Sequence, residues 1–502
     1  LEILIPFFMA DLIDQGIKPG NMNVIVKFGL ILIGMAILSF TFGALSGNFC
    51  AKASSGFAKN LRKDMFHKIQ SYSFYNIDKF SPASLVTRIT TDVNYVQQSY
   101  QMIIRIAVRS PLMLIIAMIM TFRTNVTMGL ILLIASPLLF GALLLILRFV
   151  HPQFKKVVKE YDELNNTVEE NVRATRVVKA YVRENYEIEK FGKTSNKIYK
   201  DYSKARKILA FNSPIMQIAI YTCMILISYF GAKIIVDTGS TVLTTGQLST
   251  LFQYTMQILS SLMMFSMVVI TIAISRASAQ RIVEVLDEVP NITNSENPVY
   301  EVKSGDIEFK DVSFSYTDDI SKLCLKDINL SIKSGETIGI LGGTGSSKST
   351  LISLIPRLYD ATSGKVFVGK KDVKEYDIET LRDSVAVVLQ KNVLFSGTIK
   401  ENLKWGNKNA TDKEIEKACK LACADEFIEN FPDKYDTYIE QGGTNVSGGQ
   451  KQRLCIARAL LKKPKILILD DSTSAVDTKT DSMIRRAFKE EIPKTTKIII
   501  AQ

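Results

Sequence analysis

Histidine is almost absent from this chain of 502 residues, and its cysteines form no paired motif. The two histidines, His67 and His151, lie far from any cluster of metal ligands, which argues against a metal hydrolase and against a Ser-His-Asp hydrolase. The six cysteines are scattered and no C-x-x-C pair occurs, so neither a disulfide framework nor a zinc site is indicated.

Charged residues are also few, at 22 %, whereas hydrophobic residues make up 47 %. This apolar content excludes a disordered chain, and the length allows about three domains of ~150 residues. Lys and Arg exceed Asp and Glu by 62 to 50, and the mean hydropathy is +0.13. We therefore expect a chain that is partly embedded in lipid and partly soluble.

Four long stretches contain no Asp, Glu, Lys or Arg, and each is long enough to cross a bilayer, which takes about 20 residues: 28–51, 124–147, 208–232 and 238–275. A fifth, 110–122, reaches that length if Arg105 and Arg109 snorkel to the cytoplasmic end. Residues 3–10 resemble the tail of a further span whose start lies before Leu1. We predict six spans in a transmembrane domain over 1–287, the first helix being truncated.

Two long polar connections, 52–109 and 148–207, alternate with short ones. Over 148–207 we count 15 Lys+Arg against 9 Asp+Glu, so these connections are expected in the cytoplasm. They keep helical periodicity, which predicts spans that continue beyond the lipid and turn back near 72–80 and 184–191. The chain is thus expected to be a multi-pass protein of the cell inner (cytoplasmic) membrane, in contact with lipid.

Methionines gather in the last two predicted spans, at Met216, Met224, Met256, Met263, Met264 and Met267. Flexible thioethers suit surfaces that accept several apolar shapes, so these residues are candidates for contact with a small hydrophobic or amphipathic substrate. Lipid-facing or packing side chains are the alternative interpretation.

The composition changes after Arg276: 288–300 is typical of a linker, and 301–502 alternates β-rich runs with amphipathic helices, as in an α/β domain. The runs are 307–309, 338–341, 385–389, 466–469 and 497–501. After the second of them comes a glycine-rich loop that opens a helix predicted over 351–358. Its residues are Gly342, Gly343, Thr344, Gly345, Ser346, Ser347, Lys348, Ser349 and Thr350.

This strand–loop–helix pattern predicts phosphate binding, with Lys348 reaching the β/γ oxygens and the Ser349 hydroxyl holding Mg²⁺. Ser347 departs from the pattern, which asks for Gly; if φ is positive there, its side chain costs about 1–2 kcal/mol. The run 466–469 ends in Asp470, the candidate metal-side acid, and Asp471, the candidate base; a helix N-cap is the competing role for either. Ser447, Gly448, Gly449 and Gln450 precede a helix predicted over 452–461 and offer N–H donors to an anion.

With these motifs together, the sequence resembles the exporter type of ATP-binding cassette (ABC) half-transporters over essentially its whole length. The resemblance implies an all-α membrane domain of six helices fused to an α/β P-loop ATPase, with ATP and Mg²⁺ as cofactors. It implies that Tyr316 stacks on adenine, that Gln390 reaches the metal and the attacking water, and that 171–191 belongs to a second cytoplasmic extension. The signature motif would be 445–453, and the D-loop would include Ser474 and Asp477.

Three positions depart from the family pattern: Ser347, Asp471 in place of the family's Glu, and Gln502 where the switch His would stand. Asp is one methylene shorter than Glu, and a displacement of about 1 Å can cost ~10²-fold in rate. Gln lacks the protonatable ring of His. These departures imply a site that binds ATP but hydrolyses it poorly, and the intact signature implies a second half-transporter that supplies the competent site.

The resulting prediction is a weakly hydrolysing subunit of a heterodimeric multidrug-type exporter that works by alternating access. The main alternative is an ATP-gated regulatory or sensor subunit that binds nucleotide without pumping. An importer is disfavoured because importers in this family generally keep the two domain types on separate chains. Nucleic-acid binding is not expected, because we find no basic patch with base-stacking aromatic residues.

Overall fold

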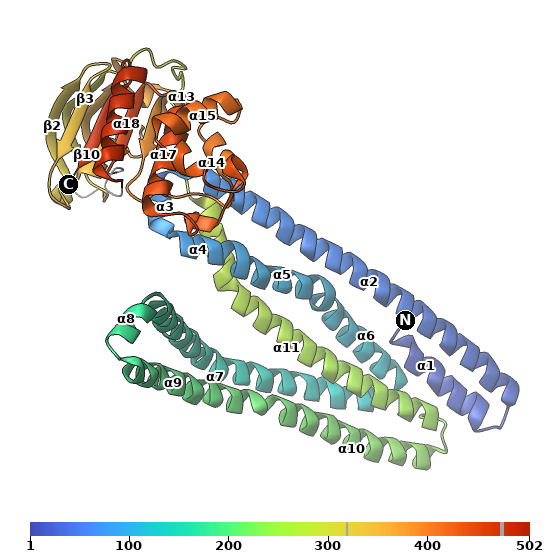
Figure 1. The fold of residues 1–502 in the computed structure, drawn as a ribbon. Coiled ribbons are helices and arrows are strands. Elements are labelled where there is room, and N and C mark those ends of the chain that lie inside the picture. Colours follow the sequence, from blue (N-terminus) through green and yellow to red (C-terminus); the bar gives the residue numbers. More distant parts are fainter. Residues whose placement is uncertain (318–319, 472–475, 502) are drawn as a thin grey trace. The chain divides into compact units, whose positions relative to one another are not determined.

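The computed structural model describes residues 1–317, 320–471 and 476–501, and it divides into two compact units (Figure 1). The first unit contains Leu1–Ile69 and Ala83–Asp287, and the second contains Gln70–Pro82 and Glu288–Gln502. A short internal segment, Gln70–Pro82, therefore folds with the C-terminal unit although helical segments of the first unit lie on both sides of it in sequence.

The first unit is entirely helical in its described residues. Its elements are α1 (Leu4–Asp11), η1 (Leu12–Ile17), α2 (Met22–Gln70), α4 (Pro82–Thr87), η2 (Arg88–Asp92), α5 (Val93–Met102), η3 (Ile103–Ala107), α6 (Arg109–Thr124), α7 (Val126–Arg173), α8 (Thr175–Ala180), α9 (Glu184–Ala210), α10 (Asn212–Thr238) and α11 (Thr245–Asp287). Among the described residues, five helical stretches are long and apolar enough to cross a membrane: Met22–Gln70, Pro82–Thr124, Val126–Val150, Glu184–Thr238 and Thr245–Asp287. Residues 3–10, predicted as the tail of a further span, lie mostly in α1 and are not among these five stretches.

Helix α11 lies at the centre of this unit, and apolar residues occur on all of its sides. Leu251, Tyr254 and Ile258 are fully buried, and α11 packs against α1, α6, α7 and α10. The Tyr254 hydroxyl donates to the carbonyl of Ile3 (3.0 Å), and Thr250 donates to the carbonyl of Pro6 (2.7 Å). Both buried hydroxyls on α11 thus find acceptors on the backbone of α1, and an apolar setting requires such partners for buried polar groups.

The first turn-back contains helix α3 (Phe74–Phe80), inside the predicted range 72–80. The second was placed wrongly: the chain turns at α8 and at Val182, whose φ is +52°, and 184–191 lies within α9. Glu184 and Glu187 occupy the first turn of α9, where acidic side chains stabilise a helix start. The same run of mixed charge therefore begins a helix and does not end one.

The second unit contains two main sheets. An antiparallel sheet has the order β2-β1-β4-β5, and a parallel sheet has the order β3-β10-β9-β6. The strands are β1 (Ile307–Phe314), β2 (Leu325–Ile332), β3 (Thr337–Leu341), β4 (Ser363–Val368), β5 (Lys371–Asp372), β6 (Val385–Val388), β7 (Gly397–Thr398), β8 (Tyr438–Ile439), β9 (Ile466–Asp470) and β10 (Thr496–Ala501). All five residues of β9 are buried, as expected for a central strand of a parallel sheet.

The helices of this unit are α3, α12 (Lys348–Ser353), α13 (Ile378–Ser384), α14 (Ile399–Lys404), α15 (Asp412–Leu421), α16 (Asp425–Ile428), α17 (Gly448–Leu461) and α18 (Thr478–Glu491), with short turns η4 (Ile320–Lys322), η5 (Val373–Glu375), η6 (Lys434–Asp436) and η7 (Gln441–Gly443). The helix predicted over 351–358 ends early, at Ser353. Pro356 disfavours helical geometry at the residue before it, and Arg357 has a φ of +51°. The helix predicted over 452–461 is present and begins four residues earlier, at Gly448.

Candidate functional site

One cavity of about 310 Å³ in the second unit brings together many of the residues singled out by motif. It is lined by Tyr316, Cys324, Thr344, Gly345, Ser346, Ser347, Lys348, Ser349, Thr350, Gln390, Asp470, Asp471 and Ile500. These residues come from the β3–α12 loop and the first turn of α12, from the ends of β9 and β10, and from the segments just after β1, just after β6 and just before β2. The cavity lies at the carboxyl ends of parallel strands, where open α/β sheets bind their ligands.

The glycine-rich loop joins β3 to α12 and closes on itself through its lysine. The Lys348 ammonium donates to the carbonyls of Gly342 (2.6 Å) and Gly343 (2.8 Å). Ser347 is the N-cap of α12 and adopts left-handed backbone angles, φ 60° and ψ 24°. A side chain in this conformation costs roughly 1–2 kcal/mol relative to glycine.

Two carboxylates enter the cavity from β9. Asp470 ends the strand and is buried, and Asp471 follows with a φ of +48°. The backbone of Asp471 is fixed on both sides, because its N–H donates to the carbonyl of Ile500 (3.2 Å) and its carbonyl accepts from Gln452 (3.3 Å). The Gln390 amide donates to the Asp471 carboxylate at 3.2 Å, so these two candidates lie together.

The competing N-cap role falls to another residue. Among the described residues after β9, Asp477 caps α18, accepting from the Thr480 N–H at 3.0 Å. That hydrogen bond holds the pKa of Asp477 below its usual range. Ser474 and Gln502, also singled out by the sequence, lie outside the described residues.

Tyr316 forms one wall of the cavity with 41 % of its surface exposed. Its hydroxyl lies 3.0 Å from the Thr350 hydroxyl, and its ring meets Phe314 and Tyr359 edge to face. An aromatic face that is both exposed and held in position suits stacking on a planar base.

The sequence analysis missed Tyr359, which joins this aromatic cluster to α3. The Tyr359 hydroxyl donates to Asp78 at 2.7 Å, and its ring lies 6.0 Å from that of Phe74. Burial, together with the neighbouring Asp78 carboxylate, raises the pKa of Tyr359 well above its usual range. Helix α3 is held further by Asn76 and Lys79, which donate to Glu288 at 2.8 and 2.7 Å.

Replacing Tyr359 with Phe is expected to lower the stability of the second unit by about 1 kcal/mol, because only the hydrogen bond to Asp78 is lost. For a unit of this size that is a fall of about 2–4 °C in Tm. The single tryptophan, Trp405, stacks on Phe395 within this unit, so its fluorescence follows the unfolding. Tyr300→Phe, at an exposed tyrosine, is the matched control; equal Tm values for both variants would contradict the role of Tyr359.

The residues of the signature motif do not line this cavity. Ser447 caps α17 in a capping box with Gln450: the Gln450 N–H donates to the Ser447 hydroxyl (3.3 Å), and the Ser447 N–H donates to the Gln450 side chain (2.9 Å). Gly448 and Gly449 open the helix behind this cap. Ser447, Gly448 and Gly449 thus form the start of the 14-residue helix α17, and none of them lines the cavity beside the chain's own phosphate loop.

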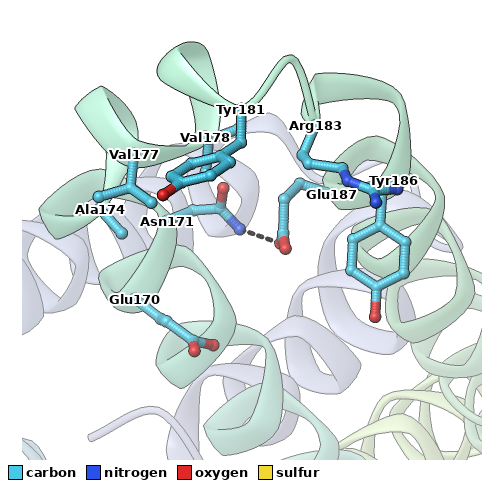
Figure 2. Close-up of a pocket in the computed structure, with 9 residues that line it drawn as sticks. All are labelled: Glu170, Asn171, Ala174, Val177, Val178, Tyr181, Arg183, Tyr186 and Glu187. Atoms are coloured by element: carbon cyan, nitrogen blue, oxygen red, sulfur yellow. Dashed lines mark hydrogen bonds between the residues drawn. The ribbon is translucent and has the colours of Figure 1, made fainter.

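The first unit has a separate pocket of about 520 Å³ at the turn between α7 and α9 (Figure 2). Asn171 donates to Glu187 at 2.5 Å across it. Its lining residues are Glu170, Asn171, Ala174, Val177, Val178, Tyr181, Arg183, Tyr186 and Glu187. Val177, Tyr181 and Tyr186 are exposed, so this turn presents apolar groups within a polar rim.

The donor set of the cavity beside the glycine-rich loop fits Mg²⁺. Among the described residues no group of three or more His, Cys, Asp or Glu side chains is placed to hold a metal. Mg²⁺ needs no such cage, since it commonly takes one or two carboxylates together with substrate phosphates. Ser349, Gln390 and Asp470 offer the oxygen ligands that it prefers, and all three line the cavity.

Comparison with known families covers both units. Residues 1–274 match the model described as "ABC transporter transmembrane region", and residues 325–474 match the model described as "ABC transporter". The chain is 38 % identical to the "uncharacterized ABC transporter ATP-binding protein YfiB" of Bacillus subtilis (strain 168), over 97 % of this chain and 84 % of that protein. It is 31 % identical to a protein named in the same way, MT1311 of Mycobacterium tuberculosis (strain CDC 1551 / Oshkosh), over 100 % of this chain and 86 % of that protein.

A solved structure described as a bacterial Atm1-family ABC exporter with ATP bound has the same fold, with a TM-score of 0.84 at 22 % identity. The match covers 100 % of this chain and 88 % of that one. The predicted fold class, a helical membrane domain followed by an α/β nucleotide-binding domain, is thereby confirmed. The chain belongs to the ABC transporter family, as a member in which a transmembrane region and an ATPase domain are fused.

Proposed function

We propose that this chain is the ATP-binding but weakly hydrolysing half of a heterodimeric ABC exporter. It moves a small hydrophobic or amphipathic substrate across the cytoplasmic membrane by alternating access. The observation that carries the proposal is the cavity in which the phosphate loop, Tyr316 and two consecutive aspartates meet, with the shorter acid Asp471 beside Gln390.

In this proposal ATP lies in the cavity with its adenine against Tyr316 and its phosphates over the loop from Gly342 to Thr350. Lys348 moves from the loop carbonyls to the β/γ oxygens, where its ammonium meets anionic acceptors in place of neutral ones. Ser349, Gln390 and Asp470 would hold Mg²⁺, which would supply positive charge against the phosphates. Tyr316, the loop residues from Thr344 to Thr350, Gln390 and Asp470 line the same cavity, which supports the assignment.

The weak step is activation of water. Asp471 occupies the position of the base, but its backbone is held by Ile500 and Gln452 and cannot move forward to compensate for the missing methylene. Gln502 in place of a switch His, and Ser347 in a left-handed conformation, add to this impairment.

The heterodimer follows from the signature motif. Ser447, Gly448, Gly449 and Gln450 form a well-capped helix start that does not face the chain's own cavity, so we assign them to ATP held by a second half-transporter. We assign Asp477, together with Ser474, to the D-loop, which would serve the same partner. Two copies of this chain would have two impaired sites, which is difficult to reconcile with steady transport.

We assign the turns of the two cytoplasmic extensions to transmitting movement from the nucleotide-binding domains to the membrane spans. Helix α3 contacts Tyr359, whose ring meets Tyr316 in the nucleotide cavity. The exposed apolar groups at the α7–α9 turn suit docking on the second chain. Met256, Met263, Met264 and Met267 are exposed on α11 and remain the candidates for contact with substrate.

Cysteine labelling tests the nucleotide cavity directly. Cys324 lines the cavity and is exposed, whereas the other five cysteines are buried, and burial raises the pKa of Cys419 to about 12. N-ethylmaleimide is therefore expected to modify Cys324 first in the native chain. At a free MgATP concentration ten times its Kd, the rate of modification should fall about tenfold.

Lys348→Ala is the control for this experiment, since the variant should lose the protection by ATP while Cys324 still reacts. Protection of wild type that survives in Lys348→Ala, or no protection at all, would contradict the assignment of the cavity. Transport of an amphipathic dye into inverted vesicles then separates an exporter from an ATP-gated sensor, because only the exporter accumulates the dye when ATP is added.

A further inference from the structure

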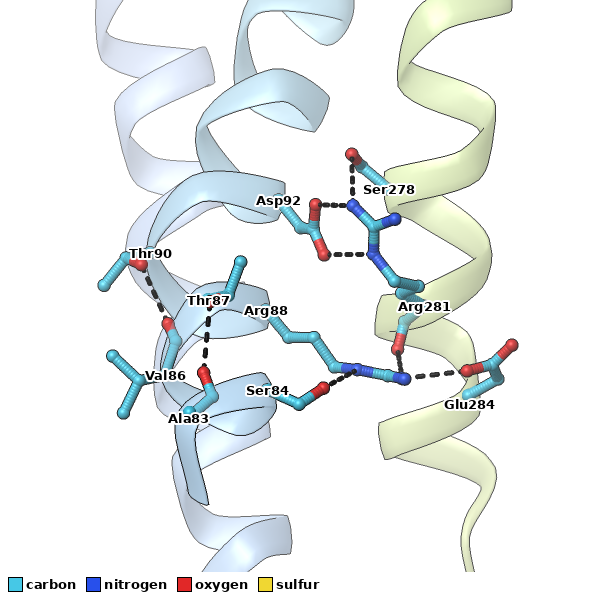
Figure 3. Close-up of polar contacts among 10 residues, drawn as sticks. All are labelled: Ala83, Ser84, Val86, Thr87, Arg88, Thr90, Asp92, Ser278, Arg281 and Glu284. Atoms are coloured by element: carbon cyan, nitrogen blue, oxygen red, sulfur yellow. Dashed lines mark hydrogen bonds and ion pairs between the residues drawn. The ribbon is translucent and has the colours of Figure 1, made fainter. Parts of the chain in front are cut away.

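A cluster of charged side chains joins η2 to the end of α11 within the first unit (Figure 3). It consists of Arg88 and Asp92 on η2, and Arg281 and Glu284 on α11. We call these four residues the η2–α11 clasp. None of them lies in the nucleotide cavity or in the pocket at the α7–α9 turn.

Asp92 is the buried centre of the clasp, with none of its surface exposed. Both of its carboxylate oxygens accept from the Arg281 guanidinium, one from Nε at 2.7 Å and the other from Nη2. Asp92 is buried, whereas the Arg281 side chain is 46 % exposed. An ion pair with a buried member is weak evidence for stability, because well-packed apolar residues at the same place are often as stable. Its best-attested use is to fix one register between two elements, and that use fits this pair.

Arg88 adds two further bonds to the same turn of α11. Its Nη1 donates to the backbone carbonyl of Arg281 (2.6 Å) and to the Glu284 carboxylate (2.9 Å). Arg281 therefore donates with its side chain to one residue of η2 and accepts with its carbonyl from another. A slide of α11 by one turn, ~5.4 Å, would break all of these bonds together.

The backbone around the clasp is shaped for this contact. The segment η2 is a π-helix, a form that occurs mostly as short turns and is frequent at functional sites. Just before and within it, Thr87 and Thr90 donate to the carbonyls four residues earlier, a pattern that bends helices. On α11 the small residues Ser275 and Ser278 are buried, so the two elements approach closely.

The clasp lies where the chain passes from one unit to the other. Arg88 follows the boundary at Pro82 and Ala83, and Glu284 precedes the boundary at Asp287 and Glu288. Within the second unit the same two segments are joined again, by Lys79 and Glu288. The two stretches of chain that cross the boundary are thus joined to each other within each unit, by the η2–α11 clasp in the first and by Lys79 and Glu288 in the second.

We propose that the η2–α11 clasp couples ATP binding to opening of the membrane unit. It holds α11 in register with η2, so that a movement of α3 started by ATP reaches the last span. Its four residues act as positioning residues, because none touches nucleotide. The inference rests on the proposed function, and it adds the residues that link ATP binding to opening of the membrane unit.

The test measures opening on the outer side without a substrate. Spin labels are placed at Asn21 and Thr241, exposed residues in the α1–α2 and α10–α11 turns, in the full assembled transporter with Cys324 replaced by Ser. Double electron–electron resonance then gives the fraction of molecules in which MgATP changes the distance between the labels. We expect Asp92→Asn to bind ATP as wild type does but to lower the ratio of shifted to unshifted molecules roughly tenfold.

The matched control is Glu189→Gln, which removes an exposed ion pair within α9 and should leave the shift unchanged. An unchanged shift in Asp92→Asn would overturn the clasp. If Asp92→Asn does not fold, Glu284→Gln carries the test, because Glu284 is 46 % exposed and its replacement leaves the Asp92–Arg281 pair intact. A smaller but measurable loss of the shift is expected, and an unchanged shift in this variant would overturn the proposal. Wild type that binds ATP without any shift would instead refute the proposed function.

Discussion

Replacing Asp471 with Glu is expected to raise the ATPase rate of the purified chain by up to about 10²-fold. The backbone of Asp471 is held at its N–H by Ile500 and at its carbonyl by Gln452, so the added methylene must extend the carboxylate toward the cavity. Gln390 already contacts the shorter acid at 3.2 Å and can follow it. Phosphate release at saturating MgATP, from the chain purified by itself in detergent, is the measurement.

Asp471→Asn is the critical control. If the native acid contributes little to hydrolysis, Asn should change the rate by less than about twofold, and Lys348→Ala gives the background. Asp tolerates the positive φ at this position better than Glu, so a slightly lower Tm for Asp471→Glu is expected and does not affect the conclusion. Brisk phosphate release by wild type that Asp471→Asn abolishes would show that the site is competent, and would end the proposal of a weak site.

Replacing Gly448 with Asp is expected to abolish turnover of the assembled transporter, with a loss of about 10²–10³-fold in ATPase rate. Gly448 is the first residue of α17, beside the exposed Ser447 cap, and the proposal places the phosphates of the partner's ATP there. A carboxylate at this position repels those phosphates. It also stabilises the helix by about 0.3–1 kcal/mol, because an acid favours a helix N-terminus, so the loss cannot be attributed to unfolding.

The neutral variant Gly448→Asn separates charge from size and should retain much more activity than Gly448→Asp. Within the same chain, protection of Cys324 by ATP should be the same in Gly448→Asp as in wild type, because Gly448 does not line that cavity. A heterodimer with one working site requires a large loss of ATPase rate in Gly448→Asp and a small one in Asp471→Asn. Equal ATPase rates for Gly448→Asp and wild type would refute the assignment of the signature motif to a partner.

Much of the fold followed from local patterns in the sequence. The charge-free stretches lie in long helices, and the β-rich runs at 338–341 and 466–469 lie in β3 and β9, because burial in lipid and in a parallel sheet both select continuous apolar residues. The phosphate loop could be located because its glycines and Lys348 have a fixed spacing. The left-handed backbone at Ser347 was considered only as a possibility, because the motif asks for Gly at this position.

What escaped prediction depends on contacts between distant residues or on subtle backbone geometry. Tyr359 and Asp78 are separated by 281 residues, and no periodicity relates them. The π-helix η2 has the same hydropathy pattern as an α-helix, since only its hydrogen-bonding differs. The second turn-back was misplaced because the acidic residues Glu184 and Glu187 indicate polarity equally well whether they end a helix or begin one.

The inclusion of residues 70–82 in the C-terminal unit has a practical consequence for isolating the ATPase. A fragment that begins at Glu288 would lose α3, which would remove Phe74 from the ring of Tyr359 and leave Glu288 without Asn76 and Lys79. Such a fragment should aggregate more readily than the intact chain. Supplying the peptide 70–82 in trans, or joining it by a flexible linker ahead of Glu288, should restore its solubility.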